Sequence, residues 1–142
     1  MRKKAVVTVN AKGHRMITAT HPTTLMITRE EEIGPTADCV VAVAADKAVA
    51  DLDAVVKESI RAGAPLEVVL EVEGMREKVL GRGDKGLSLS DKKDMVIRRS
   101  DYKCGRTLMI GADKSAAELS RKFVRKLRDP EAKVKIFIRV LE

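Results

Sequence analysis

The sequence contains two histidines, His14 and His21, which are the first residues to consider for chemistry. A metal centre built on them would need a third ligand, and Asp38 or Cys39 has a suitable side chain. The spacing of these residues matches no known metal-binding motif, so we predict no metal and no cofactor. Instead we expect a half-buried His21, with its imidazole bonded to nearby threonine hydroxyls.

The cysteines, Cys39 and Cys104, raise a second possibility, because a histidine such as His21 can hold a cysteine as a nucleophilic thiolate. Both cysteines, however, flank apolar segments with the character of strands. Buried cysteine usually serves as a small packing residue. We therefore predict a packing role for both, and the sequence leaves open whether they form a disulfide.

A glycine-rich loop, Gly81-Arg82-Gly83-Asp84-Lys85-Gly86, contains two cations. Glycines allow close approach of the backbone to a ligand, and Arg82 could clamp a phosphate. The spacing fits neither a P-loop nor a dinucleotide-binding fingerprint. A flexible hairpin turn is the favoured interpretation.

The net charge of +7 comes entirely from the second half of the chain. Residues 1–73 contain 9 Lys and Arg against 11 Asp and Glu, whereas residues 74–142 contain 19 against 10. An anionic partner should therefore meet the second half. The candidate ligand-binding cations are Arg82, Arg106, Arg121, Arg125 and Arg128. Such a surface suits a phosphate backbone, but aromatic residues are only 2% of the chain, so base stacking should not be the main mode.

An internal repeat organises the elements that must position these residues. Ala45-Asp46-Lys47 recurs as Ala112-Asp113-Lys114, an offset of 67 residues from Asp46 to Asp113. Each copy follows an apolar run and precedes a helical pattern. The apolar positions of the helices are Val49, Leu52, Val56 and Ile60, matched at the same offset by Ala116, Leu119, Phe123 and Leu127. We expect Asp46 and Asp113 to cap the helices, and Gly63 and Pro130 to end them.

Short strands surround each predicted helix. Alternating apolar residues predict strands at 66–72 and 134–140, after the helices. Before them, the sequence predicts strands at 5–9, 16–20, 25–28 and 40–43, and at 78–80, 86–89, 95–98 and 108–110. Each half is thus roughly β-β-β-β-α-β, with mostly antiparallel pairing.

The expected fold is α+β and strand-rich, a single domain spanning 1–142. Its duplicated halves, about 1–73 and 74–142, should pack by a pseudo-two-fold into one sandwich or barrel-like body with two helices. No apolar run is long enough to span a bilayer, so we predict a cytoplasmic protein without a membrane partner. The oligomeric state is not predictable from these patterns.

Several short motifs together resemble an archaeal family catalogued as a domain of unknown function, number 371. In the first half they are Gly13-His14, Ala19-Thr20-His21, Thr24, Thr28, Asp38-Cys39 and Asp46-Lys47. In the second half they are Gly81-Arg82-Gly83, Ser100-Asp101-Tyr102, Cys104, Arg106-Thr107 and Ala112-Asp113-Lys114. The resemblance runs over nearly the whole chain. It implies an archaeal source and a β-rich fold, and it implies no reaction, cofactor or substrate.

Two functional hypotheses follow. The favoured one is a binding protein whose basic second half engages nucleic acid or another polyanion. The alternative is a small enzyme or anionic-ligand binder using a polar cluster of His14, His21, Thr24 and Asp38. In that case Arg82 or Arg106 would orient the anionic ligand, and an Asp38–Arg106 pair would form if the strands that follow these residues paired.

Overall fold

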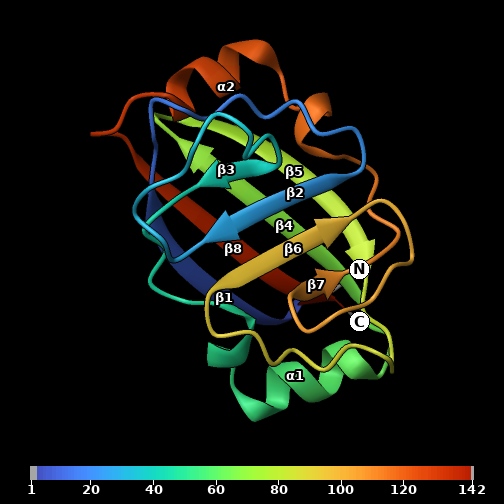
Figure 1. Ribbon diagram of the computed structural model, residues 1–142. Helices are drawn as coiled ribbons and strands as arrows, with labels where there is room; N and C mark the ends of the chain where they lie inside the picture. The colour runs from blue at the N-terminus through green and yellow to red at the C-terminus, as the bar shows by residue number, and fades with distance from the viewer. Residues whose placement is uncertain (1–2, 142) are drawn as a thin grey trace.

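Two four-stranded sheets form the body of the protein in the computed structural model, which describes residues 3–141 (Figure 1). The first sheet contains, in spatial order, β1 (Lys3–Lys12), β8 (Lys133–Leu141), β4 (Pro65–Val72) and β5 (Met75–Arg82). The second contains β3 (Val40–Ala42), β2 (Thr24–Thr28), β6 (Asp94–Arg98) and β7 (Thr107–Met109). The α+β, strand-rich class is confirmed.

Strand pairing is antiparallel throughout the first sheet and mixed in the second. β1 pairs with β8 so that Lys3 lies opposite Leu141. In the second sheet β2 and β6 are antiparallel, whereas β2–β3 and β6–β7 are parallel. The sheets meet at two corners through one isolated bridge each, Lys12–Val43 and Arg82–Ile110, and no closed barrel forms. The structure is therefore a pair of sheets rather than the barrel that the sequence left possible.

The hydrophobic core lies between the two sheets. Leu66, Val68, Leu70 and Val72 of β4 are fully buried in it. Their predicted counterparts on β8, Val134, Ile136, Ile138 and Val140, are at most 1% exposed. The alternation that places these side chains on one face is confirmed. From the other sheet, Leu25, Ile27, Met95 and Ile97 pack into the same cluster.

The two helical segments are shorter than their apolar pattern suggests. Each consists of a 3₁₀ turn, Val49–Asp51 or Ala116–Glu118, followed by a short α-helix, α1 (Ala54–Arg61) or α2 (Arg121–Leu127). Extended residues, Leu52 and Leu119, separate the turn from the helix. The predicted apolar positions are all buried, so the predicted register is confirmed although the helix is interrupted.

The expected capping role of Asp46 and Asp113 is wrong. The α-helices are capped by Asp53, which accepts from the Val56 N–H, and by Ser120, which accepts from the Phe123 N–H. Asp46 accepts instead from the Asn10 N–H (3.0 Å), and Asp113 from the Leu80 N–H (2.9 Å). Both carboxylates thus bind a strand that is remote in sequence.

The predicted strands at 16–20 and 86–89 are also wrong. Both segments are irregular, although Ile17, Ala19, Leu87 and Leu89 are buried as an alternating strand would require. Ala19 and Leu89 each have φ near 50°, in the left-handed region. This conformation breaks the extended run and turns the chain toward β2 and β6.

Each half of the chain packs a loop against the helix of the other half. A Cβ atom on Gly13 would overlap the carbonyl oxygens of Leu127 and Asp129, at the end of α2. A Cβ on Gly83 would overlap the Ile60 carbonyl, in α1. Figure 1 shows the two helices at opposite ends of the molecule. Among the described residues no helix is long and apolar enough to cross a membrane.

Candidate functional site

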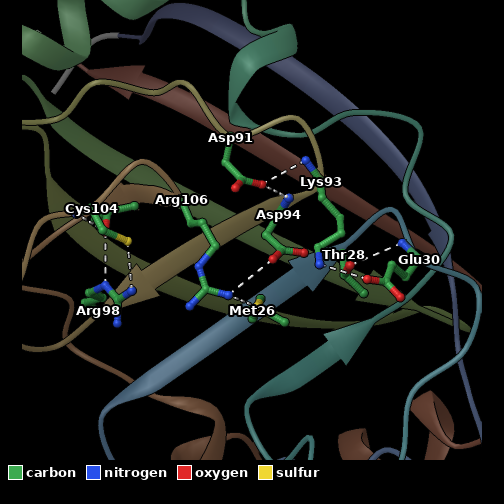
Figure 2. A network of polar contacts seen from close by, with 10 residues as sticks. Met26, Thr28, Glu30, Asp91, Lys93, Asp94, Arg98, Cys104 and Arg106 are labelled. Carbon is green, nitrogen blue, oxygen red and sulfur yellow. Dashed lines mark hydrogen bonds and ion pairs between the residues drawn. The ribbon is translucent and has the colours of Figure 1, made fainter.

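A buried carboxylate, Asp94, lies at the centre of a polar cluster on the outer face of the second sheet (Figure 2). Asp94 is 1% exposed and lies opposite Thr28 across the β2–β6 pair. The Arg106 guanidinium donates from Nη1 to Asp94 Oδ2 at 3.3 Å. Asp94 Oδ1 is also buried, but it has no hydrogen-bond partner among the described residues. The cluster therefore presents one unsatisfied acceptor.

Local backbone contacts fix both partners of this ion pair. The Asp91 carboxylate accepts from the N–H groups of Lys93 and Asp94, both at 2.8 Å, which holds the turn that starts β6. The Val96 N–H donates to the Arg106 carbonyl at 2.8 Å, which places Arg106 beside the middle of β6. From there its guanidinium reaches Asp94, the first residue of β6.

A small cavity of about 160 Å³ opens next to Asp94. Its floor includes Met26, Thr28 and Val40, and the loop after β2 contributes Glu30 and Glu32. Lys93 and Glu30 form an ion pair at its rim, with Nζ 2.9 Å from Oε1. The cavity is thus lined by charges of both signs.

Cys104 lies at the other end of β6, next to Arg98. The Arg98 guanidinium donates to Sγ at 3.4 Å and stacks over the Tyr102 ring, 4.8 Å from its centroid. Burial disfavours the thiolate, but hydrogen bonds from the Arg106 backbone, the Thr107 hydroxyl and Arg98 outweigh it and lower the pKa of Cys104 from 9.0 to about 7.

Cys39 has the opposite character. Its burial, and then the negative charge of Asp38, raise the pKa of the Cys39 thiol above 9.0. Both cysteines are free thiols and both are half-buried. The sequence-based expectation that both are packing residues therefore suits Cys39 better than Cys104.

The two histidines both use Nδ1 to accept backbone N–H groups. His21 Nδ1 accepts from the Thr23 and Thr24 N–H groups, each at 3.1 Å. The Thr23 hydroxyl is farther away, at 3.4 Å, so the backbone rather than a hydroxyl is the main partner. His14 Nδ1 accepts from the Met16 N–H at 3.0 Å, and its Nε2 lies 3.5 Å from Glu32.

The proposed polar cluster of the first half comes together only in part. The Asp38 carbonyl accepts from the His21 N–H at 3.1 Å, so His21, Thr24 and Asp38 are neighbours. His14 lies instead against α2, where its N–H donates to the Leu127 carbonyl. No three His, Cys, Asp or Glu side chains in residues 3–141 could hold a metal ion.

The expected pairing that would join Asp38 to Arg106 is wrong. β3 and β7 lie at opposite edges of the second sheet. The carboxylate partner of Arg106 is Asp94. Arg82 lies elsewhere, in a corner cleft of about 350 Å³ beside Gly111 and Asp113.

The other corner, at the Lys12–Val43 bridge, is rich in lysine. A cleft of about 370 Å³ is lined by Asn10, Lys12, Asp46, Lys133 and Lys135, among others. Lys12 lies directly opposite Lys133 across the β1–β8 pair, and Lys135 lies opposite Asn10. The ion pairs among the described residues include none of these three lysines.

The arginines predicted on α2 differ in their availability. Arg121 donates to four backbone carbonyls, those of Thr18, Ala116, Ala117 and Leu119, so its guanidinium is occupied by the fold. Arg125 and Arg128 are exposed, as are Lys122 and Lys126. Lys126 lies 3.9 Å from Glu73.

Sequence reasoning missed Asp94 and the three corner lysines. A signal for Asp94 was present, because it is the last of four consecutive charged residues, Asp91-Lys92-Lys93-Asp94, and directly precedes the apolar run Met95-Val96-Ile97. For the lysines, the alternation of Lys133 and Lys135 with buried Val134 marked an outward-facing basic side of the strand.

Comparison with known proteins places the chain in a family. A model of the family described as Domain of unknown function (DUF371) matches residues 9–141. The chain belongs to this DUF371 family. A DUF371 relative is the uncharacterized protein MJ0206 of Methanocaldococcus jannaschii, 45% identical over 121 residues, which are 85% of this chain and 90% of that protein. The resemblance noted from the motifs is thus confirmed, and an archaeal homologue is established.

Proposed function

We propose that this protein binds the phosphate backbone of double-stranded nucleic acid through a basic surface. We define this basic surface as Lys12, Lys133 and Lys135 with the exposed cations of α2 and its C-cap, Lys122, Arg125, Lys126 and Arg128. The observation that carries the proposal is the Lys12–Lys133 pair. Like charges directly opposite one another destabilise a sheet, and a phosphate between them relieves the repulsion.

The corner lysines and α2 belong to one continuous region. The Gly13 N–H donates to the Ala132 carbonyl (3.1 Å), and the His14 N–H donates to the Leu127 carbonyl (2.9 Å). These bonds join the end of β1 to the start of β8 and the end of α2. A duplex carries one negative charge per about 1.7 Å of its axis, so cations spread over such a region can each meet a phosphate.

Binding of this kind should depend strongly on salt and weakly on sequence. We would measure fluorescence anisotropy of labelled DNA and RNA duplexes of two unrelated sequences over a range of salt concentrations. The slope of log affinity against log salt counts the phosphates contacted, at about 0.9 per phosphate for B-DNA. Replacing Lys133 with alanine should reduce that slope by about one, and replacing Arg125 and Arg128 together by about two.

Lys92 provides the matched control, because it is exposed and lies in the turn before β6, on the other sheet. Lys92→Ala should leave the slope unchanged. Lys133→Glu should weaken binding while slightly stabilising the fold, since it converts a like-charge pair into an opposite-charge pair. Absence of binding at low salt, or an equal loss in Lys92→Ala, would contradict the proposal.

We further infer that residues 1–73 and 74–142 arose by internal duplication and form one domain around a pseudo-two-fold axis. The support is a set of matching backbone contacts. Lys12 and Val43 exchange hydrogen bonds as Arg82 and Ile110 do. The Ala50 N–H donates to the Asp91 carbonyl, and the Ala117 N–H to the His21 carbonyl. An experimental structure whose halves do not superpose, helix on helix, would remove this inference.

The alternative, a small enzyme using His14, His21, Thr24 and Asp38, gains less support. Both imidazoles accept backbone N–H groups through Nδ1, and His14 and His21 lie in separate turns. Polyanion binding therefore remains our preferred function.

A further inference from the structure

The cavity beside Asp94 is separate from the basic surface proposed above, because it lies on the outer face of the second sheet. Its volume of about 160 Å³ corresponds to roughly five water molecules. A compact ligand with few non-hydrogen atoms would fill it. The question is what chemistry this cavity selects.

The unsatisfied oxygen of Asp94 gives the first requirement. A buried carboxylate oxygen without a hydrogen bond destabilises the folded protein. This applies to Asp94 Oδ1, because no described residue donates a hydrogen bond to it. The Asp94 carboxylate therefore favours a hydrogen-bond donor in the cavity, and a cationic donor would also compensate its negative charge.

The fold itself does not require a charge pair at this position. In the matching turn of the first half, His21 accepts from Thr23 and Thr24 as Asp91 accepts from Lys93 and Asp94, so Thr24 matches Asp94. The Met26 N–H donates to the Cys39 carbonyl as the Val96 N–H donates to the Arg106 carbonyl. The counterparts of Asp94 and Arg106 are thus Thr24 and Cys39, an uncharged pair in the same architecture.

Arg106 gives the second requirement. Its guanidinium has five N–H donors, of which those on Nη1 contact Asp94 Oδ2 and, at 3.9 Å, Met26 Sδ, and its side chain is 45% exposed beside the cavity. An anionic group on the ligand can bond the remaining donors. Positive and negative groups then lie side by side on the protein, about 3.3 Å apart between Nη1 and Oδ2.

We propose that this cavity binds a small zwitterion whose ammonium and carboxylate lie on one carbon, as in an α-amino acid. The ligand's ammonium pairs with the Asp94 carboxylate, and the ligand's own carboxylate accepts from Arg106. The Glu30–Lys93 pair closes the rim around the ligand's side chain. A small side chain suits the limited volume of the cavity.

NMR titration of the full-length protein tests this proposal with three probes. L-alanine carries both charged groups, ethylamine carries only the ammonium, and propionate carries only the carboxylate. L-alanine should saturably shift the backbone amide signals of Thr28, Lys93 and Asp94, and the two single-group probes should bind at least tenfold more weakly. Asp94→Asn should weaken L-alanine binding on the order of ten- to a hundredfold, the range expected for a charge-assisted hydrogen bond.

Two further variants keep the result interpretable. Arg106→Gln tests the same site if Asp94→Asn does not fold, because the Arg106 side chain is partly exposed. Thr24→Val, at the matching position of the first half, should leave L-alanine binding unchanged. If no probe shifts these amides, the proposal fails. The proposal also fails if ethylamine binds as tightly as L-alanine does.

Discussion

His21 and Asp91 perform the same structural task with different chemistry. The imidazole Nδ1 of His21 accepts from the N–H groups two and three residues later, both at 3.1 Å. The carboxylate of Asp91 accepts from the N–H groups two and three residues later, both at 2.8 Å. The turn that starts β2 and the turn that starts β6 are therefore held by an aromatic nitrogen in one case and a carboxylate oxygen in the other.

This equivalence predicts an asymmetric response to substitution at His21. His21→Asp should preserve the stability of the fold, because aspartate already holds the same turn at position 91. His21→Ala removes the acceptor from two backbone N–H groups and should cost about 1 kcal/mol, as loss of a side-chain cap does. Urea denaturation of the three proteins measures the difference. Equal midpoints for His21→Ala and the native protein would show that the turn does not need its acceptor.

The sequence predicted the parts of the fold that depend on periodicity. Leu52 and Leu119 recur at the offset of 67 residues and are both buried. It failed where a polar side chain bonds a strand remote in sequence, as Asp46 and Asp113 do. It also missed Asp94, because the offset from His21 to Asp91 is 70 rather than 67. The loops between the matching turns and strands differ in length, and a single offset cannot follow them.

Leu52 and Leu119 supply a direct test of the core. Leu52 is 4% exposed and Leu119 is 2% exposed, and each ends a 3₁₀ turn just before an α-helix. Truncating either residue to alanine should lower the free energy of unfolding by about 2–5 kcal/mol, because it leaves a cavity under the helix. Val55→Ala is the matched control, since Val55 is 67% exposed. Comparable losses in all three variants would contradict the packing described above.

Gly13 and Gly83 test the packing between the two halves. Gly13→Ala should overlap carbonyl oxygens at the end of α2, and Gly83→Ala should overlap the carbonyl of Ile60 in α1. We expect each change to destabilise the protein by about 1–3 kcal/mol, as overpacking typically does. Gly34→Ala should have little effect, because nothing lies within 4 Å of the added carbon. Thermal unfolding of the three variants makes the comparison, and a neutral Gly83→Ala would exclude the close helix contact.

Cys104 should be the more reactive thiol at neutral pH. Its pKa is lowered to about 7, so the reactive thiolate is half-populated near pH 7 and the alkylation rate should rise through that value. Cys39, whose pKa is raised, should react with iodoacetamide only at higher pH. Peptide mass spectrometry distinguishes the two thiols after timed alkylation at pH values from about 5 to about 10, in steps of roughly one unit.

Arg98 provides the mechanistic control for this reactivity. Arg98→Met removes a hydrogen bond and a positive charge from Cys104, so the midpoint of the rate profile should move up toward 9.0. Cys39 should be unaffected by the same substitution. Faster modification of Cys39 than of Cys104 at neutral pH would show that the surroundings of Cys104 do not stabilise its thiolate.

The place of β1 in the first sheet has a consequence for biosynthesis. β1 lies at the edge of the sheet, and its neighbour there is β8, with Lys3 opposite Leu141. On the ribosome, β1 is made well before β8 and must therefore wait for it before the hydrogen bonds between them can form. Because closing so long a loop is entropically slow, a newly made chain exposes an unpaired β1 until β8 has been made and has paired with it. The nascent chain is most open to chaperones, and to aggregation with its neighbours, during that interval.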